Sequence, residues 1–151
     1  MNQAVDTVHD VVDYGEDRIC DSIDDLGFHM FDLDALAWET PAKRVMENAE
    51  LAPPSVVEEK WLLRSDESKD RMPISIIKFP PNYKFPRHWH EHGEFVMILK
   101  GTAYFAGREL KPGDMAYNDS RTVYGSEEAG PDGVEFLMIR RAMSTTTIVK
   151  D

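Results

Sequence analysis

The strongest chemical signal in this sequence lies in the stretch His88-Trp89-His90-Glu91-His92-Gly93-Glu94. Successive side chains of a β-strand alternate between its faces, so His88 and His90 are expected on one face, about 7 Å apart at the backbone. Two imidazoles and a carboxylate, with the other coordination positions open, are the ligand set of mononuclear non-haem iron oxygenases. We therefore predict a metal site at His88, His90 and Glu94. It would hold one divalent ion, Fe(II) first and Mn, Ni or Zn as alternatives.

The elements that must position these residues are predicted to be short strands. After the Pro53-Pro54 pair, Val and Ile are enriched in short runs separated by Gly, Pro, Asn and Asp, a pattern typical of strands joined by turns. Ala106-Gly107 suits a tight hairpin, and 111–114 suits a reverse turn. The pattern predicts an all-β fold, either a closed sheet or a sandwich. The expected strands are 56–64, 74–79, 84–90, 94–100, 102–106, 108–110, 114–117, 122–124 and 134–141.

The distribution of charge divides the chain into two parts. The 151 residues carry a formal net charge of -11, and residues 1–39 contain eleven acidic residues and one basic residue. Residues 40–151 are therefore almost neutral, and they have the size of one ordinary domain. Apolar residues at helical spacing, with Gly27 as a stop, predict two short helices in the first part. We predict an acidic, partly helical N-terminal extension over 1–39 and a β domain over 40–151.

The composition also excludes several classes of partner. An acidic chain lacks the basic face that DNA, RNA or an anionic membrane requires, so we expect no nucleic-acid partner and no membrane partner. No apolar run reaches the roughly 20 residues that span a bilayer, and residues 1–6 do not resemble a secretion signal. Cys20 is the only cysteine, which excludes an intrachain disulfide and a multi-cysteine metal site. We expect a cytoplasmic protein.

The histidine motif resembles that of the cupin family. His88-x-His90, three residues, Glu94, six residues and Gly101 have the spacing of the first conserved cupin motif. Residues 110–114 resemble the turn that opens the second cupin motif. The same residues that predict a metal site on chemical grounds therefore also occupy the positions of three metal ligands in this family.

The resemblance extends over residues 56–141. It implies the cupin double-stranded β-helix, a small jelly-roll barrel. Residues 31–38 resemble the first strand of the branch that includes anti-sigma factors and diketone dioxygenases. We therefore expect a barrel domain with a single metal centre inside it.

The sequence departs from the cupin pattern mainly at the second motif. Where a cupin usually has Pro, Gly and a fourth metal ligand, His, this chain has Asp119, Arg121 and Tyr124, and Asn82 replaces the first motif's leading glycine. A neutral phenol is a poor metal ligand and a good hydrogen-bond donor. Tyr124 is therefore expected to leave a position open for substrate or dioxygen, to act as a catalytic acid or base, or to fill space. His92 is expected at the outer edge of the site.

Side chains that share the strand parity of the ligands are expected to line an apolar substrate pocket, which suits a small, partly hydrophobic organic molecule. The opposite row on the strand after Glu94 is expected to face outward and to support a homodimer. The predicted pocket residues are Val96, Ile98, Tyr104, Phe136 and Met138. The predicted dimer row is Phe95, Met97 and Leu99. The arginines that could bind a carboxylate or an enolate, with a surface role as the default, are Arg108, Arg121, Arg140 and Arg141.

Three functions stay open at this point. The first is a mononuclear non-haem iron dioxygenase acting on a small ketone, diketone or phenolic compound, as the ligand types and the resemblance imply. The second is a non-oxidative metal-dependent lyase or isomerase in which Tyr124 moves a proton. The third is a cupin that binds a small molecule without turnover, which the altered second motif makes credible.

Overall fold

Residues 29–150 are described by the structure, a computed structural model. The chain divides between Phe31 and Asp32, and every strand described belongs to the second unit, 32–151. The two helices predicted before Gly27 lie outside the described residues. Among residues 29–150 no helix is long and apolar enough to cross a membrane.

The described unit is built from ten strands and two short 3-10 helices, which confirms the predicted all-β fold class. The helices are η1 (Ala49–Leu51) and η2 (Glu67–Lys69). The strands are β1 (Met46–Glu47), β2 (Glu58–Leu63), β3 (Ile74–Phe79), β4 (Lys84–Phe85), β5 (His88–His90), β6 (Glu94–Phe105), β7 (Arg108–Leu110), β8 (Met115–Asn118), β9 (Glu127–Arg140) and β10 (Thr146–Ile148).

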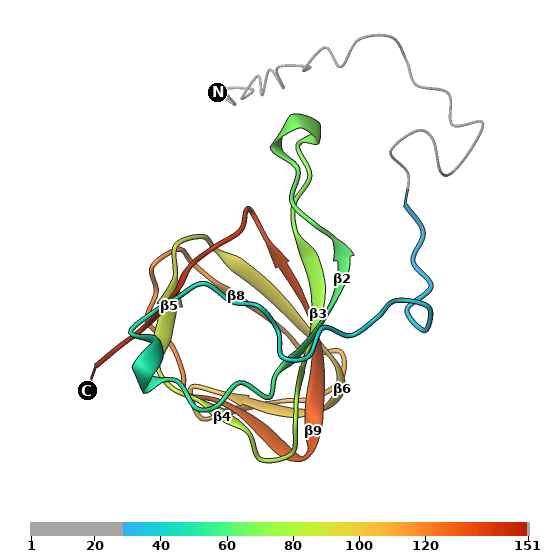
Figure 1. Cartoon of the computed structure of the whole chain (residues 1–151). Helices are drawn as coiled ribbons and strands as arrows, with labels where there is room; N and C mark the ends of the chain where they lie inside the picture. Colours follow the sequence, from blue (N-terminus) through green and yellow to red (C-terminus); the bar gives the residue numbers. More distant parts are fainter. Residues whose placement is uncertain (1–28, 151) are drawn as a thin grey trace, which may run out of the picture. The chain divides into compact units, whose positions relative to one another are not determined.

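The strands form two sheets that wind around a common core. The larger sheet has the order β2-β3-β9-β6-β7, with β4 paired to β9 and β8 paired to β6, and the smaller sheet has the order β1-β10-β5. Figure 1 looks into the resulting barrel, with β5 on one side and β3 and β9 on the other. This arrangement is the expected jelly-roll barrel.

Two long strands, β6 and β9, pair along most of their length and close the barrel. The register of this pair shifts twice, between Ile98 and Lys100 and between Gly101 and Ala103. Gly101 has a φ of +73°, and a Cβ added to it would lie 2.0 Å from the carbonyl oxygen of Gly133. The two strands can therefore approach this closely only because Gly101 has no side chain. The shifts explain why 94–100 and 102–106, predicted as separate strands, form one bent strand.

Several predicted boundaries are corrected by the structure. Strand 84–90 is interrupted and gives β4 and β5, and 122–124 forms only an isolated bridge through Tyr124. Residues 31–38 contain no strand, although Glu39 bridges Glu59. The pairing of β10 between β1 and β5 was not predicted, because its short Thr-rich run, Thr146–Ile148, has little apolar alternation.

The predicted turns are confirmed. Ala106 and Gly107 have φ values of +50° and +77° and join β6 to β7 directly, as a tight hairpin requires. At the second turn the amide of Asp114 donates to the carbonyl of Lys111 at 2.8 Å. Asn82 and Arg121 also have positive φ, 58° and 59°. They therefore hold the left-handed conformation that glycine usually takes, which accounts for the altered residue at Asn82 without a change of backbone path.

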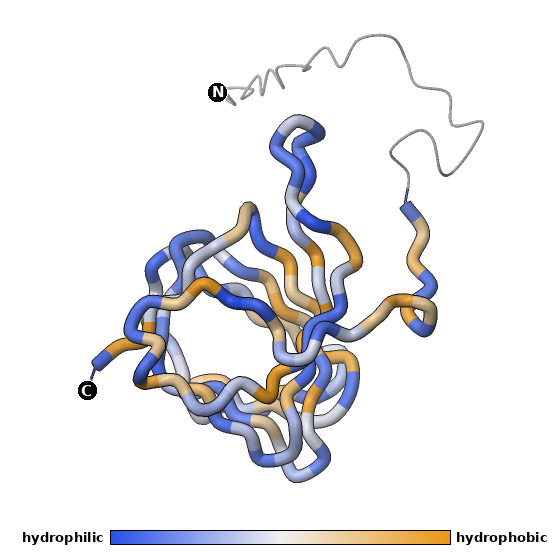
Figure 2. The backbone as a smooth tube through the Cα atoms, viewed as in Figure 1, coloured by the Kyte–Doolittle hydropathy of each residue, from blue (hydrophilic) through white to orange (hydrophobic). Residues whose placement is uncertain are grey.

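The hydrophobic core is formed by aliphatic and aromatic side chains of β3, β6, β7 and β9 in the larger sheet, together with Ala42 and Val57. Hydrophobic and hydrophilic residues alternate along much of the barrel (Figure 2), and in β5, β6 and β10 buried residues alternate with more exposed ones. The largest buried apolar side chains include Phe79, Ile77, Ile98 and Val96. Several polar side chains are buried as well, and they gather at one place in the barrel.

Candidate functional site

Strand β5 carries two buried histidines on its inner face. His88 and His90 are 1% and 5% exposed, whereas Trp89 between them is only half-buried. Antiparallel pairing with β10 sets Thr146 opposite His90. The alternation predicted from the spacing therefore brings both imidazoles into the barrel, with ring centroids 4.9 Å apart.

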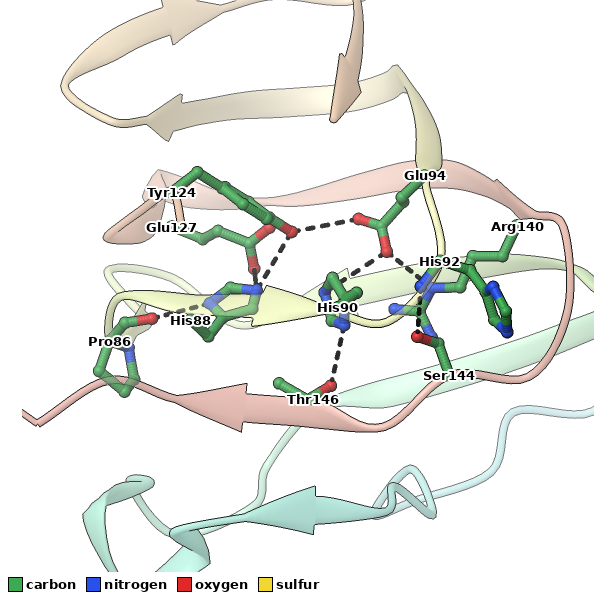
Figure 3. Close-up of polar contacts among 10 residues, drawn as sticks. All are labelled: Pro86, His88, His90, His92, Glu94, Tyr124, Glu127, Arg140, Ser144 and Thr146. Atoms are coloured by element: carbon green, nitrogen blue, oxygen red, sulfur yellow. Dashed lines mark hydrogen bonds and ion pairs between the residues drawn. The ribbon is translucent and has the colours of Figure 1, made fainter. Parts of the chain in front are cut away.

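The outer nitrogen of each imidazole has a polar partner. His88 Nδ1 lies 2.8 Å from the carbonyl oxygen of Pro86, and His90 Nδ1 lies 3.2 Å from Thr146 Oγ1 (Figure 3). A carbonyl can only accept, so Nδ1 of His88 donates this hydrogen bond, and Nε2 of the same ring faces the interior. For His90 the hydroxyl can donate or accept, so both tautomers are compatible with the contact. Burial lowers the pKa of His90 to about 3, which keeps its ring neutral.

Glu94, at the start of β6, faces both histidines and is 2% exposed. Its Oε2 lies 3.5 Å from His90 Nε2 and accepts a hydrogen bond of 2.6 Å from Arg140 Nε (Figure 3). Burial acts to raise the pKa of Glu94, but the charge and hydrogen bond of Arg140 hold it below its ordinary value. Glu94 is therefore an ionised carboxylate in a buried ion pair.

Tyr124 lies between the carboxylate and the first histidine. Its backbone exchanges two hydrogen bonds of 3.0 Å with His88, which fixes the phenol beside the imidazole. The hydroxyl donates to Glu94 Oε1 at 3.2 Å and lies 3.1 Å from His88 Nε2. Burial, reinforced by Glu127 and Glu94, raises the pKa of Tyr124 well above its ordinary value. A neutral phenol thus has one proton and two acceptors within reach.

Glu127 is a second buried carboxyl group that the sequence reading missed. It begins β9, and its Oε2 lies 4.0 Å from His88 Nε2. Burial raises the pKa of Glu127 above its ordinary value. Glu127 lies two residues before Ala129 and therefore on the same face of β9, and both are buried. The predicted strand began at Val134, so this relation was not used. Arg140 was considered as an anion-binding residue, with a surface role as its default; the structure instead buries it beside Glu94.

The donor types in this cluster fit a divalent transition metal, but the carboxylate is already engaged. His88 and His90 supply imidazoles and Glu94 supplies a carboxylate, the combination that such ions accept. Among residues 29–150, however, no three His, Cys, Asp or Glu side chains form a group arranged to hold a metal ion. Metal binding at these residues would therefore require Glu94 to exchange part of its contact with Arg140 or Tyr124 for the ion.

Two cavities reach the cluster from different sides. The first, of about 640 Å³, is lined by Arg140, Thr146 and Met138 among others. The second, of about 500 Å³, is lined by Tyr124 and by residues of β7 and β8. Each cavity therefore shares at least one lining residue with the cluster.

Most of the residues predicted to line the pocket do not line either cavity. Val96, Ile98 and Phe136 belong to the hydrophobic core, and of the predicted set only Met138 lines one of these two cavities. Tyr104 is half-buried, because the register shift in β6 moves Ala103 and Phe105 inward instead. Strand parity alone could not show this, since it does not report where the barrel interior is already filled by side chains.

The remaining predicted residues lie around the cluster. His92 is half-buried, and among the described residues its only hydrogen bond is from its backbone amide to Ser144 Oγ, at 3.1 Å. This is consistent with the expected position at the edge. Arg121 lies over the ring of Trp89, 5.7 Å from the centroid, on the outer side of β5.

Comparison with known proteins agrees with the fold. Residues 75–140 match a protein family described as "Cupin domain". No curated protein matches the sequence.

Solved structures that resemble this one belong to proteins of several functions. A proposed dioxygenase from Nostoc punctiforme has 14% identity and a TM-score of 0.67, over 80% of this chain and 41% of that protein. The polyketide cyclase RemF from Streptomyces resistomycificus has 16% identity and a TM-score of 0.60, over 75% and 78% of the two chains. A proposed acetylacetone dioxygenase from Methylibium petroleiphilum has 18% identity and a TM-score of 0.58, over 81% of each chain. At these identities the common feature is the fold.

Proposed function

This chain carries a cupin domain, and on that premise we propose that it is a metal-dependent enzyme, a mononuclear non-haem iron dioxygenase acting on a small ketone, diketone or phenolic compound. In this proposal His88, His90 and Glu94 hold the metal. Fe(II) is the proposed ion because dioxygen chemistry needs a redox-active metal, which zinc is not. Manganese and nickel are the alternatives that keep the same ligand types.

The observation that carries the proposal is the direction of the two imidazoles. The Nδ1 atoms of His88 and His90 are occupied by Pro86 O and Thr146 Oγ1, so that both Nε2 atoms face the carboxylate and the phenol. Outer contacts of this kind orient histidines that bind metals. Tyr124 Oη lies 3.1 Å from His88 Nε2 and 3.2 Å from Glu94 Oε1, so that the phenol links the first histidine to the carboxylate.

The residues around the proposed centre have separate tasks. A bound iron ion would supply the redox chemistry. Arg140 orients Glu94 through a charge-assisted hydrogen bond of 2.6 Å. Tyr124 holds a proton on its hydroxyl, which it can give to a substrate oxygen. The buried surroundings of His88, His90 and Glu94 exclude water from the reacting groups.

The choice of reaction rests partly on analogy. Two proteins of the same fold are proposed dioxygenases, one of them for acetylacetone, a small diketone. A shared fold raises the expectation of a related reaction without establishing it. Acetylacetone is therefore a suitable first probe.

Oxygen uptake by the iron-loaded protein tests the proposal. With acetylacetone, and then with small phenols, we expect the wild type to consume dioxygen and His88→Ala to fall to background while keeping its circular dichroism spectrum. His92→Ala is the matched control, because the ring of this neighbouring histidine makes no hydrogen bond or ion pair to the cluster among the described residues. Iron-loaded wild type that consumes no dioxygen with either class of probe would overturn the proposal.

A second candidate is favoured by the contacts of Glu94. Both of its oxygens have partners, Tyr124 and Arg140, in an arrangement that suits proton transfer by the phenol better than an open coordination position. The corresponding function is a non-oxidative lyase or isomerase. Turnover under nitrogen with zinc in place of iron would select it, and a tightly bound ligand without turnover would indicate a binding cupin.

A further inference from the structure

The first cavity has more cationic than anionic groups available to a ligand. Four of its lining residues are basic and two are acidic, but some of these charges are already neutralised. Arg64 forms an ion pair with Glu39, and Arg140 with Glu94. Lys43 and Arg44 have no ion pair among the described residues. The basic lining residues are Lys43, Arg44, Arg64 and Arg140, and the acidic ones are Glu39 and Glu59.

The negative charge available from Glu59 does not balance the positive charges of Lys43 and Arg44. Glu59 is buried, and burial raises its pKa above the ordinary value, which favours its neutral form. Even with Glu59 ionised, Lys43 and Arg44 would leave one positive charge in excess. The cavity is therefore suited to an anion.

The backbone on both sides of Arg44 is fixed. The amide of Ala42 donates to the carbonyl of Val57 at 2.7 Å, and the carbonyl of Val45 accepts from the amide of Thr146 at 2.9 Å. Thr146 is also the residue that contacts His90 Nδ1. Arg44 is half-buried, and its charge helps to lower the pKa of His90. The backbone that carries Arg44 is thus fixed before any ligand binds, which reduces the entropy lost on binding.

The rest of the cavity wall suits an organic body. Trp61, Met138 and Met143 supply apolar and polarisable surface, and Ser144 and Thr145 supply hydroxyl groups. A volume of about 640 Å³ is in the range of small-molecule sites. A compact inorganic ion would leave most of this space unfilled.

We propose that this cavity binds a small organic carboxylate, with its carboxylate group on Arg44 and Lys43 and its hydrocarbon part against Trp61 and Met138. The proposed site narrows the substrate class of the proposed enzyme to those compounds that also carry a carboxylate group. It rests on the proposal that the barrel is the active site. Arg140 and Thr146 line the same cavity, and they contact Glu94 and His90 respectively. Arg44 is a specificity-determining residue in this arrangement, because guanidinium groups bind carboxylates through two parallel hydrogen bonds.

Calorimetric titration of the full chain with benzoate and with its uncharged analogue benzamide tests the proposal. Wild type is expected to bind benzoate at least about tenfold more tightly than benzamide. Arg44→Gln is expected to lose about tenfold in benzoate affinity and to leave benzamide affinity unchanged. Arg108→Gln, which removes a cation from the second cavity, is the control and should change neither.

The exposed residue Lys43 provides a second variant if Arg44→Gln does not fold, and Lys43→Gln should weaken benzoate binding in the same direction. Equal binding of the two probes, binding of neither probe, or benzoate affinity that is insensitive to both variants would overturn the proposal. Metal content is measured in parallel. Normal metal with failed benzoate binding refutes only the carboxylate site, whereas benzoate selectivity without metal refutes only the metal-dependent reaction.

Discussion

At the scale of single residues, the pair Glu94 and Arg140 departs most from a simple metal-ligand set. A buried carboxylate without a partner is costly, and here the partner is a guanidinium whose side chain is itself only 14% exposed. The pair keeps Glu94 ionised and fixes its direction. A cation that binds Glu94 must therefore compete with Arg140 at Oε2 or with Tyr124 at Oε1.

Replacing Arg140 is expected to destabilise the protein strongly. Arg140→Met leaves Glu94 buried and uncompensated, which should lower the free energy of unfolding by about 3–5 kcal/mol at neutral pH. Urea unfolding followed by circular dichroism measures this change. Lys69→Met is the control, because the pair of Lys69 with Asp66 is exposed and its loss should leave stability almost unchanged. A loss below about 1 kcal/mol for Arg140→Met would contradict the inferred buried ion pair.

The metal-free protein is expected to lose stability on acidification because of His90. The pKa of His90 is about 3 in the folded protein against an ordinary 6.5, so between these values the unfolded chain takes up a proton that the folded protein does not. The free energy of unfolding should therefore fall by about 1.4 kcal/mol per pH unit across this window. Glu94, whose pKa is also depressed, adds to the loss at lower pH, whereas Glu127, whose pKa is raised, acts in the opposite direction.

The His90 contribution is isolated by comparison with His90→Gln. Chelator-treated samples of both proteins are unfolded in urea at a series of pH values. The free energy of unfolding of the wild type should fall relative to that of His90→Gln as the pH falls from 6.5 toward 3. A difference that stays constant with pH would show that His90 is not held neutral by burial.

The sequence identified the residues of the cluster that have a motif and missed those that depend on tertiary contacts. His88, His90, Glu94 and Tyr124 could be found because alternation and spacing place them together. Nothing local distinguishes Arg140 from Arg141, and the parity of Glu127 with Ala129 becomes informative only once both are known to lie in one strand. Their burial depends on which strands pair with β9, and this information is spread over the whole sheet.

At the scale of elements, the crossing of β6 and β9 determines the shape of the barrel. The strands Ile74–Phe79 and Arg108–Leu110 were predicted with their observed bounds, because clear turns flank them. The long strands were divided in the prediction at Gly101 and before Val134, since glycine normally signals a break. In the structure these glycines are bulge positions inside continuous strands.

Gly101 is expected to tolerate no side chain. Gly101→Ala combines the cost of a left-handed conformation, about 1–2 kcal/mol, with a steric conflict against Gly133 that should add about 1–3 kcal/mol. Gly107 is the matched control, because its φ of +77° is similar but nothing lies within 4 Å of an added Cβ. Gly107→Ala should therefore show only the first cost in denaturant titrations. Equal losses for the two variants would contradict the proposed close approach of β6 to β9.

At the scale of the whole molecule, most of the net charge lies outside the candidate site. Of the net charge of -11, residues 1–39 account for -10. The groups of the candidate site all lie between Pro86 and Thr146, in the nearly neutral part. The expectation that no polyanion binds therefore rests on the charge of the whole chain. It does not apply to the cavity, where Arg44 and Lys43 favour an anion.

A homodimer is our prediction for the assembly. The row Phe95, Met97 and Leu99 alternates with the buried residues of β6 and is only partly buried within the chain. Light scattering at micromolar concentration should give twice the mass of 17.3 kDa. Replacing Met97 by Glu should shift the mass toward the monomer. A wild type that is monomeric at this concentration would reject the prediction.

The most direct test of a metal centre is elemental analysis by mass spectrometry of protein purified without added metal. We predict about one divalent transition metal ion per chain in the wild type and in His92→Ala, and a loss of at least about tenfold in occupancy in His90→Ala and Glu94→Gln. Wild type that stays metal-free after incubation with Fe(II) under nitrogen, or variants that keep full occupancy, would contradict the assignment of His88, His90 and Glu94 as ligands.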